Sequence, residues 1–193
     1  LYHFSHGNNI HYEKGSDGGD YIWIANYGTR DSENKYTNPQ ILSRVKLSNG
    51  TVVRNTDTRD NWYFGTKTLH ASFDIKNDRL AIYSQNDGYT LKIYSLSEVL
   101  ATPVTNVTLP VAITYGGGNS SDQEQKDVKP VVSCHDCSGL KPLYSFVYKY
   151  TSNGRGWQTF CISGERVYFF LYYTNNTNGM YFQSVLDVFD LNG

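Results

Sequence analysis

Histidine and glutamate residues near the start of the chain are spaced in a way that could support acid–base chemistry. His11 and Glu13 alternate along a segment expected to be a β-strand, so both side chains would point to the same face. His6 lies one strand length earlier, and His70 begins a later strand. An imidazole beside a carboxylate can move a proton or, with further ligands, hold a metal ion. The sequence has no H-x-H or H-E-x-x-H spacing, however, so we expect no catalytic residue and no metal site.

The Cys134-x-x-Cys137 motif could supply two ligands to a structural zinc ion. Such a site needs four ligands, and the sequence offers no second C-x-x-C to complete it. Cys161, the third cysteine of the chain, could contribute, but nothing in the pattern requires it. A loop disulfide or free thiols explain the motif more simply. We therefore expect neither a metal nor a cofactor.

The composition predicts a folded chain that is rich in β-strands. Hydrophobic residues make up 39% of the 193 residues, and aromatic residues, which suit the pleated faces of sheets, make up 15%. A formal net charge of −1 leaves no basic stripe to neutralise phosphates, so we expect no nucleic-acid binding. The longest apolar run, Val167–Tyr173, is far shorter than the roughly 20 residues of a membrane-spanning helix, so we expect no membrane insertion.

Internal repeats organise the chain. Three segments share one order of elements: a strand that begins with polar residues, a tight turn, a strand apolar on both faces, a polar loop and a closing strand. The turns KGSDGGD, KNDR and SGER contain the glycine, asparagine or aspartate residues typical of hairpins. A strand that is apolar on both faces must be covered on both, as in the middle of a stack of sheets. The three segments are His6–Gly50, Leu69–Leu96 and Trp157–Gly193.

We interpret the repeat as consecutive blades of an all-β protein, a β-propeller. The chain would hold about three antiparallel blades, and because a closed ring needs roughly four to eight, we expect further blades or a homo-oligomer to complete it. A β-sandwich of short strands is the alternative. The expected layout is a single partial domain over residues 1–193, with blades at about 4–56, 66–113 and 144–193 and a loop excursion at 116–141.

The blades would also need outer strands, and helices should be rare. Thr51–Thr56 and Asn106–Ile113 are the expected fourth strands of the first and second blades. The sequence offers only two short helix candidates, Ser95–Leu100 and Asp122–Val128, each of about two turns at best.

The heads of the inner strands are the candidate binding residues. In a propeller, His6, His70 and Gln158 would approach the central axis at one end and could hydrogen-bond a hydroxyl-rich or phosphate-bearing ligand. An indole close by could stack on sugars, and nearby cations could meet phosphates. The alternative is that these side chains only cap the channel through water and backbone. The predicted ligand-binding residues are His6, Asn8, Lys67, His70, Arg155, Trp157 and Gln158.

Longer motifs resemble a known family. The pattern H-G-x-x-I…YIWI…ILSRVKL-x-NG, then T-x-H-A-x-F-D…N-x-RLAIY…LKIYSL, then W-Q-x-F…G-x-x-VYFF resembles the helveticin J-like bacteriocins. It equally resembles the propeller domains of phage baseplate receptor-binding proteins and the related TagC-type proteins of Gram-positive bacteria. The resemblance implies a propeller that recognises bacterial envelope polymers, with teichoic acid as the favoured class.

These observations together predict a binding module and not an enzyme. We expect non-enzymatic recognition of a cell-wall polysaccharide or teichoic acid by a phage receptor-binding or secreted wall-binding protein. Such a protein would be extracellular, on the cell surface or on a virion. One alternative is a bacteriocin or wall-active hydrolase in which His6, His70 and Glu13 do the acid–base work. Another is a structural propeller that only mediates protein contacts.

Overall fold

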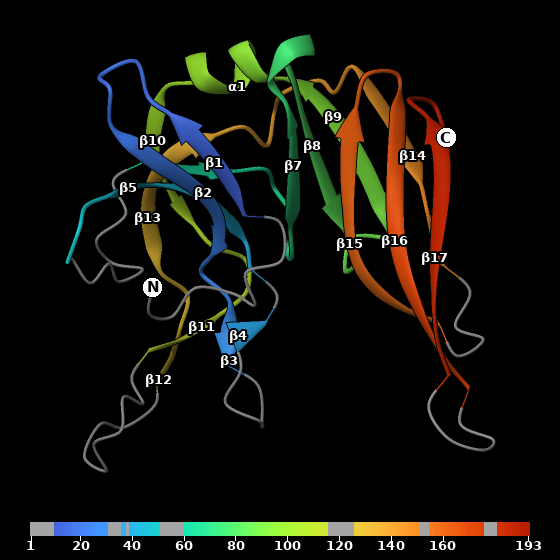
Figure 1. Cartoon of the computed structure of the whole chain (residues 1–193). Helices are drawn as coiled ribbons and strands as arrows, with labels where there is room; N and C mark the ends of the chain where they lie inside the picture. The colour runs from blue at the N-terminus through green and yellow to red at the C-terminus, as the bar shows by residue number, and fades with distance from the viewer. Residues whose placement is uncertain are drawn as a thin grey trace.

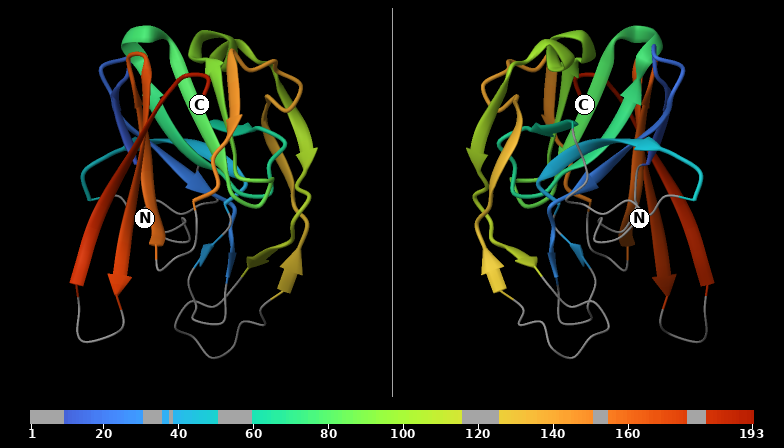
Figure 2. Two further views of the ribbon diagram at one scale, coloured as in Figure 1. Left: turned by 90° about the vertical axis from the view of Figure 1, so that its right-hand side faces the viewer. Right: turned by 90° about the vertical axis from the view of Figure 1, so that its left-hand side faces the viewer.

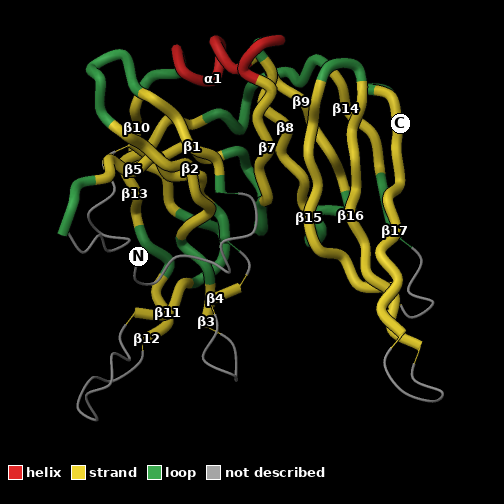
Figure 3. The backbone as a smooth tube through the Cα atoms, viewed as in Figure 1, coloured by secondary structure: helices red, strands yellow, loops and turns green. Residues whose placement is uncertain are grey.

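The computed structural model describes residues 10–30, 36–37, 39–50, 60–115, 126–150, 155–175 and 181–193. Strands make up most of the described residues, and α1 (Leu96–Ala101) is the one short α-helix among them. The prediction of an all-β fold is therefore confirmed. Figures 1 and 3 show how the strands gather into sheets, with α1 near one end of the molecule. No helix among the described residues has the length and apolar character needed to cross a membrane.

The first sheet has six strands, most of which pair in antiparallel fashion. Its β1–β2 hairpin turns where Gly18 adopts a positive φ of 75° and the Asp17 carboxylate accepts a hydrogen bond from Gly19 N. The fifth strand, β13, pairs in parallel with β6 and in antiparallel fashion with β10. In spatial order the strands are β1 (His11–Lys14), β2 (Asp20–Asn26), β5 (Ile41–Leu47), β6 (Asp60–Tyr63), β13 (Val131–Asp136) and β10 (Val104–Thr108).

The second sheet has four antiparallel strands. A short 3-10 turn, η2 (Ile75–Asn77), joins its first two strands, and Asp78 ends that turn in the left-handed region. Helix α1 directly follows β9, the third strand of this sheet in chain order. Ser95 caps the helix by accepting a hydrogen bond from Glu98 N. The helix predicted from SLSEVL is thus confirmed. The spatial order is β14 (Tyr144–Val147), β9 (Thr90–Ser95), β8 (Arg79–Ser84) and β7 (His70–Asp74).

The third sheet is a meander of three long strands. The tight turn between its first two strands is made possible by Gly164, whose φ is +58°. In order, the strands are β15 (Arg155–Ser163), β16 (Arg166–Asn175) and β17 (Tyr181–Asp190). Two small ribbons complete the described elements: β3 (Thr29–Arg30) with β4 (Tyr36–Thr37), and β11 (Ile113–Tyr115) with β12 (Lys126–Val128).

Several sequence predictions about strands were wrong. The expected loop excursion at 116–141 contains β12 and β13, and the segment 126–128, predicted as helix, is a strand. Residues 106–113 do not form the outer strand of the second sheet, because β10 pairs with β13 in the first. The outer position of the second sheet is filled by β14, although the blade bounds 144–193 predict this segment in the third unit. β6 takes the fourth position of the first sheet, and the predicted strand 51–56 lies outside the described residues.

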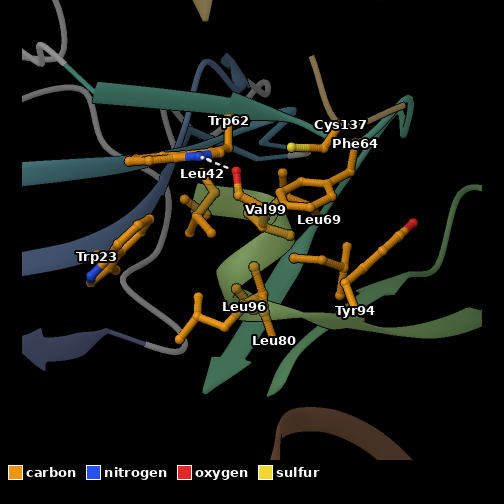
Figure 4. Packing of buried hydrophobic residues seen from close by; sticks show 13 residues of the cluster. Trp23, Leu42, Trp62, Phe64, Leu69, Leu80, Tyr94, Leu96, Val99 and Cys137 are labelled. Carbon is orange, nitrogen blue, oxygen red and sulfur yellow. Dashed lines mark hydrogen bonds between the residues drawn. The ribbon is translucent and has the colours of Figure 1, made fainter. Parts of the chain in front are cut away.

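The second sheet lies between the other two, so both of its faces are buried. On β8, Leu80 and Ile82 point into one apolar cluster, which they share with Trp23 and Leu42 of the first sheet. Figure 4 shows part of this cluster. The intervening residues, Ala81 and Tyr83, belong to a second cluster with side chains of the third sheet, such as Phe169. The prediction that a strand apolar on both faces is covered on both is confirmed for β8.

The first strand of each sheet lies at the sheet edge, and these three edge strands are neighbours (Figures 1 and 2). His11 of β1 stacks on Phe73 of β7, with ring centroids 4.5 Å apart. On the other side of β7, Ser72 Oγ accepts a hydrogen bond from Ile162 N, and Asp74 Oδ2 accepts one from Gly164 N. The three sheets therefore meet along their first strands, β1, β7 and β15, and extend away from these edges. No closed propeller is formed by the described residues.

Candidate functional site

A β-bulge places Trp157 between the second and third sheets. The register of β15 against β16 shifts between Trp157 and Thr159, so Gln158 has no opposite residue. Without that bulge, strict alternation along β15 would put Trp157 on the face opposite Phe160, because the two residues are three positions apart. With it, Trp157 joins Phe160 in the cluster that buries the second sheet against the third. Gln158 itself is exposed. The bulge therefore turns the indole inward and the amide outward.

His70, the first residue of β7, meets Trp157 from the neighbouring sheet. The two ring centroids are 4.2 Å apart, with an angle of 51° between the planes. Burial disfavours the imidazolium and lowers the pKa of His70 from 6.5 to about 4. At neutral pH the ring is therefore uncharged, with one donor and one acceptor nitrogen. The prediction that His70 and the head of β15 converge agrees with this geometry, although Trp157 and not Gln158 makes the contact.

The indole N–H of Trp157 is the unusual feature of this contact. Nε1 is buried, yet no described residue accepts its hydrogen bond. The other two tryptophans are satisfied: Trp23 Nε1 donates to Glu13 at 2.5 Å, and Trp62 Nε1 donates to Val99 O at 3.2 Å. A buried donor without an acceptor costs about 1–3 kcal/mol. Such a group in a folded protein calls for an explanation, such as water or a ligand that completes it.

Tyr83 packs beside the Trp157–His70 contact, and the sequence analysis did not identify it as a site residue. It is paired with His70 in register, and its ring centroid lies 5.9 Å from that of Trp157. Its hydroxyl donates to Tyr148 O at 2.8 Å, and burial raises its pKa above the usual range. The phenol is therefore a fixed, neutral group. In the sequence, Tyr83 lies within the run LAIYS, where nothing distinguishes it from the apolar core residues around it.

The loop before His70 brings a cation to the same end of the second sheet. Lys67 N donates to the Asp87 carboxylate at 2.8 Å, and Ser84 Oγ donates to the same oxygen at 2.6 Å. The Lys67 side chain is left exposed. Next to it, Thr66 Oγ1 is buried without a hydrogen-bond partner among the described residues. The sequence did not indicate Thr66, because a threonine in the polar stretch GTKT reads as an ordinary loop residue.

The remaining predicted site residues are only partly placed. His6 and Asn8 lie outside the described residues. Arg155 begins β15 and pairs with Tyr173 in register, but the described structure does not include its side chain. Of the seven predicted ligand-binding residues, the described structure therefore brings His70 and Trp157 into contact and leaves Lys67 and Gln158 exposed.

His11 and Glu13 do share a strand, but Glu13 is engaged in structural contacts. Its carboxylate accepts hydrogen bonds from Arg44 at 2.7 and 3.0 Å as well as the one from Trp23. Burial alone would raise the pKa of Glu13, but these hydrogen bonds outweigh it and lower the pKa. A carboxylate held ionised in this way is a poor general acid. The contact partners of Glu13 therefore give no support to the acid–base role considered for it.

The cysteines are free thiols in different environments. Cys134 lies in the cluster around Ile41, whereas Cys137 lies in the cluster between the first two sheets. Burial raises the pKa of both thiols to about 11. Cys161 is exposed on β15. Within the part of the chain that the structure describes, no three His, Cys, Asp or Glu side chains gather as metal ligands would.

An open groove of about 820 Å³ lies between the end of α1 and residues 139–143. Its wall includes Thr102, Lys141 and Leu143. None of the predicted ligand-binding residues lines it, and among the described residues its walls contain no unpaired buried polar atom. We therefore place the candidate site at the Trp157–His70 contact and not in this groove.

The chain matches no protein-family model, and comparisons with curated proteins and with solved structures find no match either. The family resemblance described above therefore stays a prediction, and the site must be judged from its own geometry.

Proposed function

We propose that this chain is a binding module built from propeller blades, and that it recognises an oxygen-rich polymer of the bacterial envelope without cleaving it. The arrangement of the sheets supports the blade interpretation. Each sheet begins with an edge strand, and the edge strands β1, β7 and β15 lie side by side, as the inner strands of consecutive blades do. Such a module would act outside the cell, on a cell surface or on a virion.

The observation that carries the binding proposal is the unpaired indole N–H of Trp157. A hydroxyl or phosphate oxygen of a ligand would accept the hydrogen bond that no described residue accepts. Completing a buried donor adds more to affinity than adding a bond at an exposed site, because it removes the penalty already present in the free protein. The indole and imidazole rings beside it offer apolar surface to a sugar or polyol chain.

The charges around the contact favour binding over hydrolysis. The low pKa of His70 is caused by burial, and no charged neighbour contributes to it. A general base is normally oriented by a third group, and none of the described residues plays this part for His70. Lys67, exposed at the same end of the sheet, could meet a phosphate of the polymer. Because the chain carries a net charge of only −1, we expect recognition of ligand shape, with weak dependence on salt.

Retention on purified Gram-positive cell walls, prepared with and without teichoic acid, tests the proposal. The wild-type protein should be retained only by the walls that carry teichoic acid and should release no soluble fragments. Replacing Trp157 with Phe keeps an aromatic ring but removes the N–H, and we expect about fivefold to tenfold weaker retention from the loss of one hydrogen bond. Unchanged retention of this variant would show that the site is wrong, and release of sugar fragments would show that the class is wrong.

A pair of lysine variants provides the matched control. Lys67 and Lys76 are both exposed, but they lie at opposite ends of β7. Lys67→Ala should weaken retention, whereas Lys76→Ala removes the same charge and should leave retention unchanged. Equal losses in the two variants would indicate general charge attraction and contradict a defined site.

A further inference from the structure

The outer face of the third sheet is apolar and uncovered. Phe170, Leu186 and Val188 are 41%, 53% and 49% exposed, although their neighbours Phe169 and Leu171 are completely buried on the inner face. Register pairing places Phe170 opposite Leu186 and Tyr168 opposite Val188, so these side chains form two adjacent rungs. We call this surface the outer apolar face: Tyr168, Phe170, Leu186 and Val188. Contiguous exposed apolar patches of this kind mark interaction surfaces.

The opposite end of the stack of sheets is different. On the outer face of the first sheet, Ile22, Ile24 and Val45 form their own cluster and are 8%, 2% and 3% exposed. The second sheet is buried on both faces by its neighbours. The stack is therefore closed at the first sheet and open at the third. Among the described residues, the outer apolar face is therefore the end of the stack at which a further molecule could pack face to face.

Charge at one end of this face shows which molecule fits. Arg166 of β16 and Asp190 of β17 lie opposite each other in register, at the end of the same two strands. Both are exposed, and Arg166 forms no ion pair with any other described residue. Consider a two-fold axis parallel to the strands and midway between β16 and β17. That axis would place Arg166 of one copy over Asp190 of the other, and Phe170 over Leu186, with each contact made twice.

We propose that the outer apolar face packs against the same face of a second copy of this chain, related by that two-fold axis. An isologous contact requires one self-complementary patch, and this patch pairs opposite charge with opposite charge and apolar with apolar side chains. Sheets that pack face to face with nearly aligned strands are a common arrangement. Because a two-fold contact uses the same patch of both copies, the assembly closes as a dimer and does not grow into a filament. This inference does not depend on the ligand proposed above.

Sedimentation velocity over a range of protein concentrations tests the dimer. The wild-type protein should sediment as a dimer, and Leu186→Lys should sediment as a monomer because it places two like charges at the centre of the contact. Val147→Lys is the control, since Val147 is 68% exposed on β14, away from this face, and it should leave the dimer intact. Circular dichroism must show the same fold in both variants. A wild-type monomer at every concentration, assemblies larger than a dimer, or a Leu186→Lys dimer would overturn the proposal.

Charge exchange distinguishes self-association from binding to an unrelated protein. Arg166→Glu and Asp190→Arg should each weaken the dimer, because each places like charges opposite one another across the two-fold axis. The double variant restores opposite charges at both contacts and should recover most of the wild-type dissociation constant. Failure of the double variant to recover would contradict the two-fold arrangement, even if the single variants weaken association.

Discussion

Strand β7 separates two regions that use tryptophan differently. On one face, Phe73 packs against Trp23, with ring centroids 5.1 Å apart. On the other face, His70 packs against Trp157 at 4.2 Å. In the first region the indole N–H is bonded to Glu13, which Arg44 holds in turn. In the second region the indole N–H has no acceptor among the described residues. Tryptophan therefore has two roles here. The Trp23 indole is hydrogen-bonded within the fold, whereas the Trp157 indole keeps a donor that no described residue uses.

The difference shows how a binding site can be distinguished from core packing in a protein without an obvious catalytic motif. Aromatic packing by itself stabilises the fold and gives no indication of function. A buried donor without an acceptor, by contrast, lowers the stability of the free protein. Such a cost is tolerated where a ligand removes it. The Trp157 indole is therefore the candidate binding group, and the Trp23 indole is the internal control. His11 Nε2 on the Trp23 side is also buried without a partner among the described residues, so the comparison is between the two indoles.

The largest expected effect on stability comes from changing Glu13, the hydrogen-bond acceptor of Trp23. Glu13→Gln removes the charge that Arg44 pairs with and weakens the bond to Trp23, so we expect a loss of about 2–3 kcal/mol in the free energy of unfolding. Since the pKa of Glu13 is lowered, its contribution is present above the ordinary value of 4.5 and is lost as the pH falls. Urea unfolding at pH 7 and pH 3 checks both statements. A variant as stable as the wild type at pH 7 would contradict the structural role.

On the Trp157 side of β7, His70 should make the free energy of unfolding depend on pH. Its pKa is about 4 in the folded protein and 6.5 ordinarily, so the unfolded chain binds the proton first. Stability is therefore full above pH 6.5 and falls as the pH drops from 6.5 to 4, by about 1–2 kcal/mol after allowance for partial exposure. His70→Gln should flatten this part of the urea-unfolding profile. An unchanged slope would show that the ring is not buried as described.

Phenylalanine substitutions compare the two indoles directly. Trp23→Phe loses a hydrogen bond and leaves a charged partner less satisfied, whereas Trp157→Phe removes a donor that has no partner. Both lose similar ring volume, so Trp23→Phe should be more destabilising by about 1 kcal/mol. Thermal or urea unfolding of both variants measures the difference. Equal losses would mean that the Trp157 N–H is bonded in solution.

The smallest effect concerns the thiols, which report on the interfaces without altering them. At pH 8 the exposed Cys161 should react with Ellman's reagent, whereas Cys134 and Cys137, with pKa values of about 11, should not react until the protein unfolds. Rapid reaction of more than one thiol in the folded protein would show that the clusters around the other two cysteines open readily.

The sequence predicted local features of this fold better than the partners of its strands. The continuous apolar run LAIYS correctly indicated burial on both faces of β8, and the short helix candidate Ser95–Leu100 correctly indicated α1. Strands β10, β13 and β14 were misplaced, because their partners lie far away in the sequence. In particular, β14 joins the sheet of β9 and not the unit that follows it. Segment VVSCHD alternates buried and exposed residues, but its polar composition resembled a loop.

The candidate site was only partly predictable for a related reason. The convergence of His70 with the head of β15 followed from the repeat, since equivalent strands occupy equivalent positions. The bulge at Gln158 did not, because it shifts the alternation by one residue with no glycine or proline to mark it. That shift exchanged the roles expected for Trp157 and Gln158. The unpaired N–H depends on what surrounds the indole in space, which residue spacing does not encode.

The most direct test of the central claim is to follow the three indole N–H signals by nitrogen–proton NMR during a titration with purified poly(ribitol phosphate) teichoic acid. The account predicts that the Trp157 signal shifts and becomes protected from exchange with solvent, while the Trp23 and Trp62 signals stay in place because Glu13 and Val99 already accept their hydrogen bonds. A Trp157 signal that does not move at saturating polymer would contradict the account.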